Sequence, residues 1–287
     1  TAMYALASLD ISTGEMDTGE VTGPDLPGEL VRLSPGEIIT TDGVLADSEL
    51  KRWIDIAGAA TTPVPSASFD SLAGERGLKS QLGVTELGGF GGFSRSELAA
   101  VGALLRYIDL TQIGKKPVIR PPRRMGDGGV LVIDAASRSS LELTRSSSGD
   151  KAGSLLAAID RTVTAAGARE LSQRLASPLR DVAAIEHRLN AVSFLVAEAA
   201  LRDALRERLR GAPDIARAVT RLAFGRGGPR DLGALRDGLE AAATCAGLIN
   251  KAGAAMGLPL ELERVVRNLS AANPDLSADL TAALADD

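Results

Sequence analysis

The side chains that most often carry catalysis or bind transition metals are scarce in this chain. Its 287 residues include a single histidine, His187, and a single cysteine, Cys245. One of each cannot supply the usual ligands of a zinc site, and so few candidates argue against a Ser-His-Asp or Cys-His hydrolase. His187 lies on the polar side of a helical pattern, so we interpret it as a surface residue.

The glycines match neither of the common phosphate-binding motifs. A P-loop needs a Gly-Lys pair followed by Ser or Thr, but Gly114-Lys115 is followed by Lys116. A G-x-G-x-x-G pattern that begins at Gly89 needs a glycine at position 94, where the chain has serine. We therefore predict no cofactor in this chain. We interpret the remaining glycine cluster as a loop or hinge, formed by Gly88, Gly89, Gly91 and Gly92.

Asp10 follows a predicted first strand, where ribonuclease H-like nucleases carry a metal-binding carboxylate. Such enzymes use two metal ions to clamp an in-line phosphoryl displacement, which requires at least two more carboxylates nearby. Three are available, although none lies in a distinctive motif: Asp42, Asp47 and Asp70. In the structural alternative, which we favour, Asp10 accepts hydrogen bonds from the turn at Ser12-Thr13.

The charge differs between the two halves of the chain. Residues 1–114 carry 7 Lys+Arg and 16 Asp+Glu, a net charge of −9, whereas residues 115–287 carry 25 and 21, a net charge of +4. Such a shift indicates a domain boundary. The acidic half is unsuited to a phosphate backbone, and the excess in the second half is a weak footprint for nucleic acid.

The composition is that of a soluble globular protein, with 45% hydrophobic and 24% charged residues. No apolar run approaches the ~20 residues that span a bilayer. Residues 1–10 lack the basic and apolar regions of a signal peptide. We expect a cytoplasmic protein that does not contact a membrane.

The first half of the chain mixes strands with short helices, which favours an α/β domain. Ser94 and Glu97 form a capping-box pattern at the start of a helix that ends near Gly114. Residues 115–129, rich in Pro, Gly and Arg, are typical of a linker. We predict strands at 4–11, 15–21 and 37–41, helices at 25–33 and 47–57, and a hairpin that pairs 130–134 with 141–144.

The second half is almost entirely helical in pattern. Apolar residues predict one helix through Leu156, Ile159, Val163, Leu171 and Leu175, which Pro178 ends. Asp181 can cap the next helix, whose apolar stripe is formed by Ile185, Leu189, Val192 and Leu195 or Val196. Further helices begin at Pro213-Asp214 and Pro229, and two more contain Leu262–Leu269 and Leu276–Leu284.

One segment resembles a known signature. Asp134-Ala-Ala-Ser-Arg-Ser-Ser-Leu-Glu-Leu-Thr144 is similar to the sequence DAATRRNLELT, which opens the core domain of the MutS family of DNA mismatch repair proteins. Further matches follow in the family's order and spacing at 154–164, 167–169, 178–181, 185–189, 214–215 and 221–232. At Ser139-Ser140 the chain departs from the family's usual Arg-Asn. The motif residues that we single out are Asp134, Arg138, Leu141, Glu142, Asp160, Arg161, Gly167, Arg169, Pro178 and Arg180.

The resemblance implies a two-domain organisation. Residues 1–114 correspond to the connector domain, an α/β domain of ribonuclease H-like fold. Residues 115–287 correspond to the first half of the all-helical core or lever domain, without the clamp. We expect the stripe Leu276, Leu280 and Leu284 to lack a partner, because in the family the helices that return from the clamp pack against the core.

The resemblance also implies a function without catalysis in this chain. The mismatch-binding and ATPase domains of the family have no counterpart here, so ATP and Mg are expected only in the full-length protein. The connector and lever would link those two domains mechanically, and the connector would offer a surface to MutL. Mismatched double-stranded DNA and a second MutS subunit would be partners of the full-length protein. The alternative is a metal-dependent ribonuclease H-like nuclease that uses Asp10.

Overall fold

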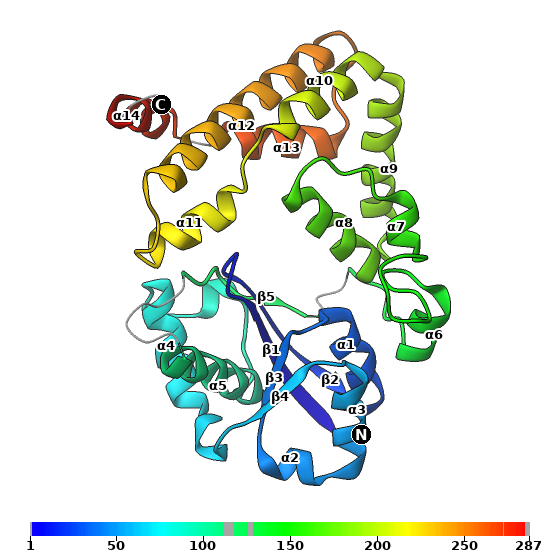
Figure 1. The fold of residues 1–287 in the computed structure, drawn as a ribbon, viewed down its shortest axis with the longest axis vertical. Helices are drawn as coiled ribbons and strands as arrows, with labels where there is room; N and C mark the ends of the chain where they lie inside the picture. Colours follow the sequence, from blue (N-terminus) through cyan, green and yellow to red (C-terminus); the bar gives the residue numbers. More distant parts are fainter. Residues whose placement is uncertain (1, 112–117, 126–128, 272, 285–287) are drawn as a thin grey trace. The chain divides into compact units, whose positions relative to one another are not determined.

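The computed structural model describes residues 2–111, 118–125, 129–271 and 273–284. They belong to two compact units, residues 1–155 and residues 156–287 (Figure 1). The first unit has a mixed α/β architecture and the second is helical, which confirms the predicted fold class.

Two small sheets form the centre of the first unit. Strand β1 (Met3–Asp10) pairs antiparallel with β2 (Glu15–Thr22), and β5 (Arg123–Arg124) joins β2 in parallel. Strand β3 (Glu37–Thr40) pairs in parallel with β4 (Ala60–Pro63). The three predicted strands are therefore confirmed.

Helices and short 3-10 turns surround these strands. The helices are α1 (Leu26–Leu33), α2 (Asp42–Ala46), α3 (Ser48–Ile56), α4 (Ser71–Leu82), α5 (Arg95–Thr111) and α6 (Ala135–Leu141), and the turns are Gly23–Asp25, Ser66–Ser68 and Gly88–Phe90. The capping box before α5 is confirmed, because the Glu97 amide donates to Ser94 Oγ at 3.1 Å and the Ser94 amide donates to Glu97 Oε2 at 2.7 Å.

The core of the first unit has two parts. Met16, Leu78, Val101, Leu105 and Ile119 lie in one cluster, where α4 packs against α5 and α5 packs against β1 and β2. The second cluster forms around three residues of α1 and α3, Leu26, Leu30 and Ile54.

The predicted hairpin of residues 130–134 and 141–144 is wrong. Residues 135–141 form helix α6, and the Asp134 carboxylate accepts a hydrogen bond from the Ser137 amide at 2.9 Å. An aspartate at this position satisfies an amide that has no partner inside the helix. This local cap therefore outweighs the strand preference of the apolar residues on either side.

The predicted linker of residues 115–129 is largely part of the first unit where it is described. Residues 118–125, which we call the strap, run alongside β2. The Arg120 amide donates to the Gly14 carbonyl at 2.8 Å and the Met125 amide donates to the Thr18 carbonyl at 2.7 Å. Ile119 is buried in the core. The remaining linker positions 115–117 and 126–128 lie outside the described residues.

The second unit is built around one long helix, α12 (Pro229–Met256), against which α10, α11, α13 and α14 pack (Figure 1). Besides α12, its helices are α7 (Leu155–Ile159), α8 (Ala165–Ala176), α9 (Val182–Ala197), α10 (Ala199–Arg210), α11 (Ile215–Ala223), α13 (Leu260–Ser270) and α14 (Pro274–Ala283). The predicted cap at Asp181 is confirmed, and the helix predicted to begin at Pro213-Asp214 is capped by Asp214, since each carboxylate accepts from an amide of the following helix.

Part of the predicted apolar stripe of α9 is exposed instead of buried. Leu189, Val192 and Val196 are 57%, 56% and 65% exposed. Ala191 and Phe194, together with Leu195 of the predicted stripe, form a core cluster with residues of α12 and α13. Because α9 carries apolar residues on both sides, its periodicity could not identify the side that packs within this chain.

Two other helical predictions need correction. The helix predicted from Leu156 to Leu175 is divided into α7 and α8, since the Asp160 carboxylate accepts from the Thr162 amide at 3.1 Å and turns the chain there. The sequence pattern also gave no separate signal for α10.

The leucine stripe at the end of the chain is partly covered. Leu280 is buried and α14 contacts α12, whereas Leu276 is 40% exposed. The expectation that the whole stripe lacks a partner is therefore wrong for Leu280.

The compact units and the predicted domains divide the chain at different positions. The predicted boundary at 114/115 lies outside the described residues, whereas packing divides the chain at 155/156. The difference arises because the strap pairs with β2 and α6 packs against α1. Among the described residues, no helix combines the length and the apolar character needed to cross a bilayer.

Candidate functional site

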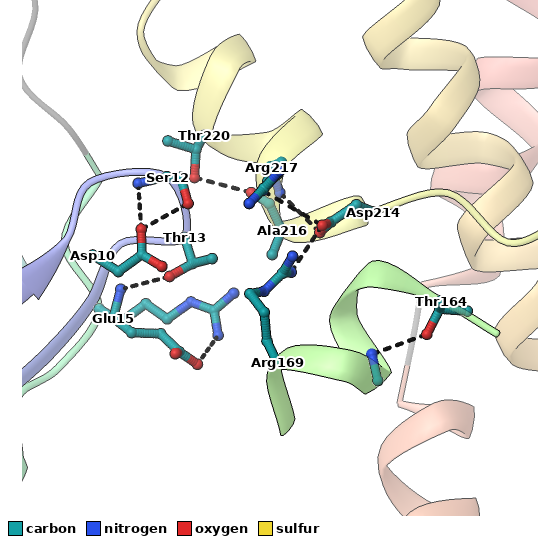
Figure 2. Close-up of polar contacts among 12 residues, drawn as sticks. Asp10, Ser12, Thr13, Glu15, Thr164, Arg169, Asp214, Ala216, Arg217 and Thr220 are labelled. Carbon is teal, nitrogen blue, oxygen red and sulfur yellow. Dashed lines mark hydrogen bonds and ion pairs between the residues drawn. The ribbon is translucent and has the colours of Figure 1, made fainter. Parts of the chain in front are cut away.

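Asp10 organises the turn between β1 and β2. Its Oδ1 accepts hydrogen bonds from the Ser12 amide and the Ser12 hydroxyl, both at 2.7 Å (Figure 2). Partial burial acts to raise the pKa of Asp10, but the hydrogen bonds from Ser12 and Thr13 outweigh it and lower the pKa. This is the structural role that the sequence favoured.

The other carboxylates considered for metal binding lie elsewhere in the first unit. Asp47 accepts from the amides of Glu49 and Leu50 at the start of α3, and Asp70 caps α4 in the same way. Asp42 is the first residue of α2. Within the described ranges, no three His, Cys, Asp or Glu side chains come close enough to hold a metal ion. The geometry does not favour the nuclease alternative.

The family motif begins with a tight fold around α6. Asp134 also accepts from the Ser137 hydroxyl at 2.7 Å, and the hydroxyl and amide of Ser137 lower its pKa. Arg138 is buried, and its pKa is lowered by burial and then by the charge of Arg32. Leu141, by contrast, is 57% exposed.

Glu142 ends α6 and connects it to the next segment. Its backbone is left-handed, with φ 45°, and its carboxylate accepts from the Ser147 amide at 2.6 Å. That amide and the Ser147 hydroxyl lower the pKa of Glu142. The Glu142 carbonyl accepts from the Leu155 amide at 2.9 Å. The motif residues in the first unit therefore build local structure.

The motif residues of the second unit begin between α7 and α8. The Arg161 carbonyl accepts from Arg206 Nη1 at 2.9 Å, which connects this segment to α10. The Gly167 amide donates to Thr164 Oγ1 at 2.9 Å and caps α8. Pro178 and Arg180 follow the end of α8, where Pro178 is half-buried and Arg180 is exposed.

The structure joins two motif segments that lie 45 residues apart. Arg169 Nη2, on α8, lies 2.8 Å from Asp214 Oδ2, and Arg217 Nε lies 3.6 Å from the same oxygen (Figure 2). Asp214 Oδ1 accepts from the Arg217 amide at 3.4 Å, so the carboxylate also caps α11. We call these three residues the Asp214 cluster.

A second ion pair connects α11 to α12. Arg221 Nε donates to Asp231 Oδ1 at 2.7 Å, and Asp231 Oδ2 accepts from the Gly228 amide at 3.1 Å. Hydrogen bonds from Arg221 and then Gly228 lower the pKa of Asp231. The Asp214 cluster therefore attaches α8 to the start of α11, and this pair attaches α11 to the start of α12. The sequence analysis did not identify the Arg221–Asp231 pair, although both residues lie in the matched segment 221–232.

Sequence analysis also missed a buried ion pair in the first unit. Glu97, which is fully buried, lies 3.1 Å from Arg124 Nη2 of the strap. Arg124 also donates to the Gly92 carbonyl, so it fixes the end of the glycine cluster. The capping-box signal identified Glu97 but not its partner.

The predicted glycine hinge lies within the first unit, between α4 and α5. Gly88, Gly89 and Gly92 are exposed, and Gly91 has φ 105°. Phe90 and Phe93, in and beside the cluster, pack against the core of the unit. Bending at these glycines stays a prediction.

Comparison with known proteins gives the same family for both units. Residues 1–120 match the family model described as MutS domain II, and residues 136–284 match the one described as MutS domain III. The chain is 48% identical over 284 residues to the DNA mismatch repair protein MutS of Azorhizobium caulinodans, covering 99% of the chain and 30% of that protein. It is 47% identical over 269 residues to the Caulobacter vibrioides protein of the same name, covering 93% and 30%. The chain therefore spans about a third of the length of these relatives.

Proposed function

Because this chain belongs to the MutS family of DNA mismatch repair proteins, we propose that it serves as the mechanical link between a mismatch-binding part and an ATPase part of a longer protein. In this role the chain itself neither hydrolyses ATP nor cuts DNA. ATP, Mg, mismatched duplex and a second MutS subunit would be bound by the longer protein in the cytoplasm. The first unit would offer a surface to MutL.

The observation that carries the proposal is the way α12 is fixed at its N-terminal end. With 28 residues it is about 42 Å long at 1.5 Å per residue. The Arg221–Asp231 pair attaches its first turn to α11, the Gly228 amide caps that turn by donating to Asp231, and α10 and α13 pack along the helix. Packed helices transmit a displacement along their length because protein interiors compress little.

The side chain of Ile215 on α11 packs closely against the backbone of α12. A Cβ atom added at Gly238 would lie 2.3 Å from Ile215 Cγ1, so only glycine lets the first residue of α11 pack this closely on α12. By contrast, a Cβ atom added at Gly233, on the same helix, would meet no atom within 4 Å. These two glycines offer a matched pair of positions for testing the link.

The test is a chimera in which this chain replaces the matching segment of the Azorhizobium caulinodans relative. We expect mismatched duplex to stimulate its ATP hydrolysis. Gly238→Val should reduce that stimulation while duplex binding and basal hydrolysis remain, because α11 is forced away from α12. Gly233→Val, which changes the helix propensity of α12 in the same way, should couple normally. Equal coupling in the two variants, or an unmodified chimera without stimulation, would contradict the proposed role.

A further inference from the structure

Helix α8 is weakly attached to the rest of the second unit. None of its residues is buried, and it takes no part in the extensive helix–helix contacts formed by the described residues of that unit. It has 12 residues, and isolated helices of fewer than about 12–15 residues are marginal in water. Its order therefore depends on a small number of tertiary contacts.

The Asp214 cluster provides such a contact. Arg169 is on the second turn of α8, and its side chain and that of Asp214 are 33% and 19% exposed. Asp214 Oδ2 is itself buried and accepts no hydrogen bond from any described residue, although Arg169 Nη2 is 2.8 Å away. The attraction is therefore mainly one between charges, and Arg217 of α11 provides a second cation at 3.6 Å from the same oxygen.

Asp214 consequently has two separable roles. Its Oδ1 caps α11, and its Oδ2 attracts Arg169 of α8. If Arg169 leaves, the carboxylate still has Arg217 beside it and still caps α11. The loss of the Arg169 contact therefore leaves no isolated buried charge, which would otherwise make separation costly.

From this arrangement we infer that the Arg169–Asp214 ion pair is a releasable joint that controls whether α8 is ordered against α11. When the ion pair is formed, α8 is held against the N-terminus of α11. When the ion pair is broken, α8 unfolds locally and the rest of the unit stays folded. This is an order–disorder transition of one segment. The ordering of α8 by this ion pair does not depend on the proposed transmission role. Only its functional consequence, that α8 can be uncoupled from α12, rests on that role.

The experiment measures hydrogen exchange of the 287-residue chain at low ionic strength, without DNA or ATP. We expect Arg169→Gln and Asp214→Asn each to accelerate exchange of the α8 amides about fivefold, which corresponds to about 1 kcal/mol at 1.4 kcal/mol per decade. Asparagine caps a helix as well as aspartate does, so Asp214→Asn leaves the α11 cap in place. Exchange in α12 should not change in either variant.

Arg174→Gln is the matched control, because Arg174 is on the same helix and pairs only within it among the contacts described, with Glu170 at 2.7 Å. It should change α8 exchange less than twofold. The inference is overturned if Arg169→Gln behaves like Arg174→Gln, or if α12 is deprotected together with α8. These exchange measurements do not depend on ATPase coupling in the chimera. The inference about α8 and the proposed function can therefore fail separately.

Discussion

Replacing Gly74 by alanine should destabilise the first unit, although alanine is the better helix former. Gly74 is on α4, where a Cβ atom would lie 1.9 Å from the Leu98 carbonyl oxygen of α5. Ordinary contact begins at 3.4 Å, so the two helices would have to separate by about 1.5 Å. The neighbouring Leu78 and Val101 are fully buried, so the separation would loosen the packing of the larger core cluster.

The expected magnitude follows from two opposing effects. Overpacking of a core typically costs about 1–3 kcal/mol, and a clash with backbone rather than with a movable side chain belongs at the upper end of that range. Alanine in place of glycine recovers about 1 kcal/mol of helix propensity. The net loss should be about 2 kcal/mol, which lowers the Tm of a unit of this size by about 4–8 °C.

The assay uses Trp53, the single tryptophan of the chain. It packs edge-on against Tyr4 with ring centroids 6.4 Å apart, so its fluorescence reports unfolding of the first unit. Gly43→Ala on α2 is the control, because a Cβ atom there would meet only Thr41 Oγ1, at 3.8 Å. We expect Gly43→Ala to be neutral or slightly stabilising. A Gly74→Ala midpoint equal to or above the unmodified value would refute the close approach of α4 and α5.

Four further results are expected. The purified chain should neither hydrolyse ATP nor cleave DNA with Mg²⁺ present; turnover that Asp10→Asn abolishes would establish the nuclease alternative. It should also bind a G·T duplex no better than a paired duplex at physiological salt, since discrimination requires contacts to base edges or an intercalating side chain; a preference of several-fold in a binding titration would contradict this. The pKa of Asp231 is lowered in the folded state. Its contribution to stability is therefore complete above about pH 4, the ordinary aspartate pKa, and is lost as the pH falls through the lowered value. The Tm difference between the unmodified chain and Asp231→Asn, followed by circular dichroism, should shrink below pH 4. Burial raises the pKa of Cys245, so a thiol reagent at pH 8 should label it slowly until the second unit unfolds, and rapid labelling of the folded chain would argue against its burial on α12.

Features that depend on neighbouring residues could be predicted from the sequence. The caps at Ser94 and Asp181 join side chains to amides three residues away, and such hydrogen bonds form wherever the local sequence permits them. The β1–β2 pair is similarly local, because a short turn leaves only one direction for the returning strand. The order and spacing of the motif from Asp134 to Leu232 were also sufficient to identify the family, as the matches to MutS domains II and III confirm.

Reading a segment by its composition and local pattern alone led to two of the errors. Apolar residues on both sides of Asp134 suggested a hairpin, but the N-cap hydrogen bond to Ser137 stabilises α6 instead. Residues 115–129 have a linker composition, yet the described strap pairs with β2 and contributes Ile119 to the core. Composition records how many polar and apolar residues a segment has, but not whether a strand edge is available to pair with it.

Only the tertiary structure could decide which faces and which charges meet. Helix α9 is apolar on two sides, and the positions of α12 and α13 select Ala191 rather than Leu189 as the buried side. Likewise, a sequence with 32 basic and 37 acidic residues offers many possible ion pairs. Arg169 and Asp214 lie 45 residues apart, as Glu97 and Arg124 lie 27 apart, and each pair forms only because the fold brings its two segments together. The attraction between two charges acts over a few ångströms in space and leaves no spacing in the sequence from which it could be recognised.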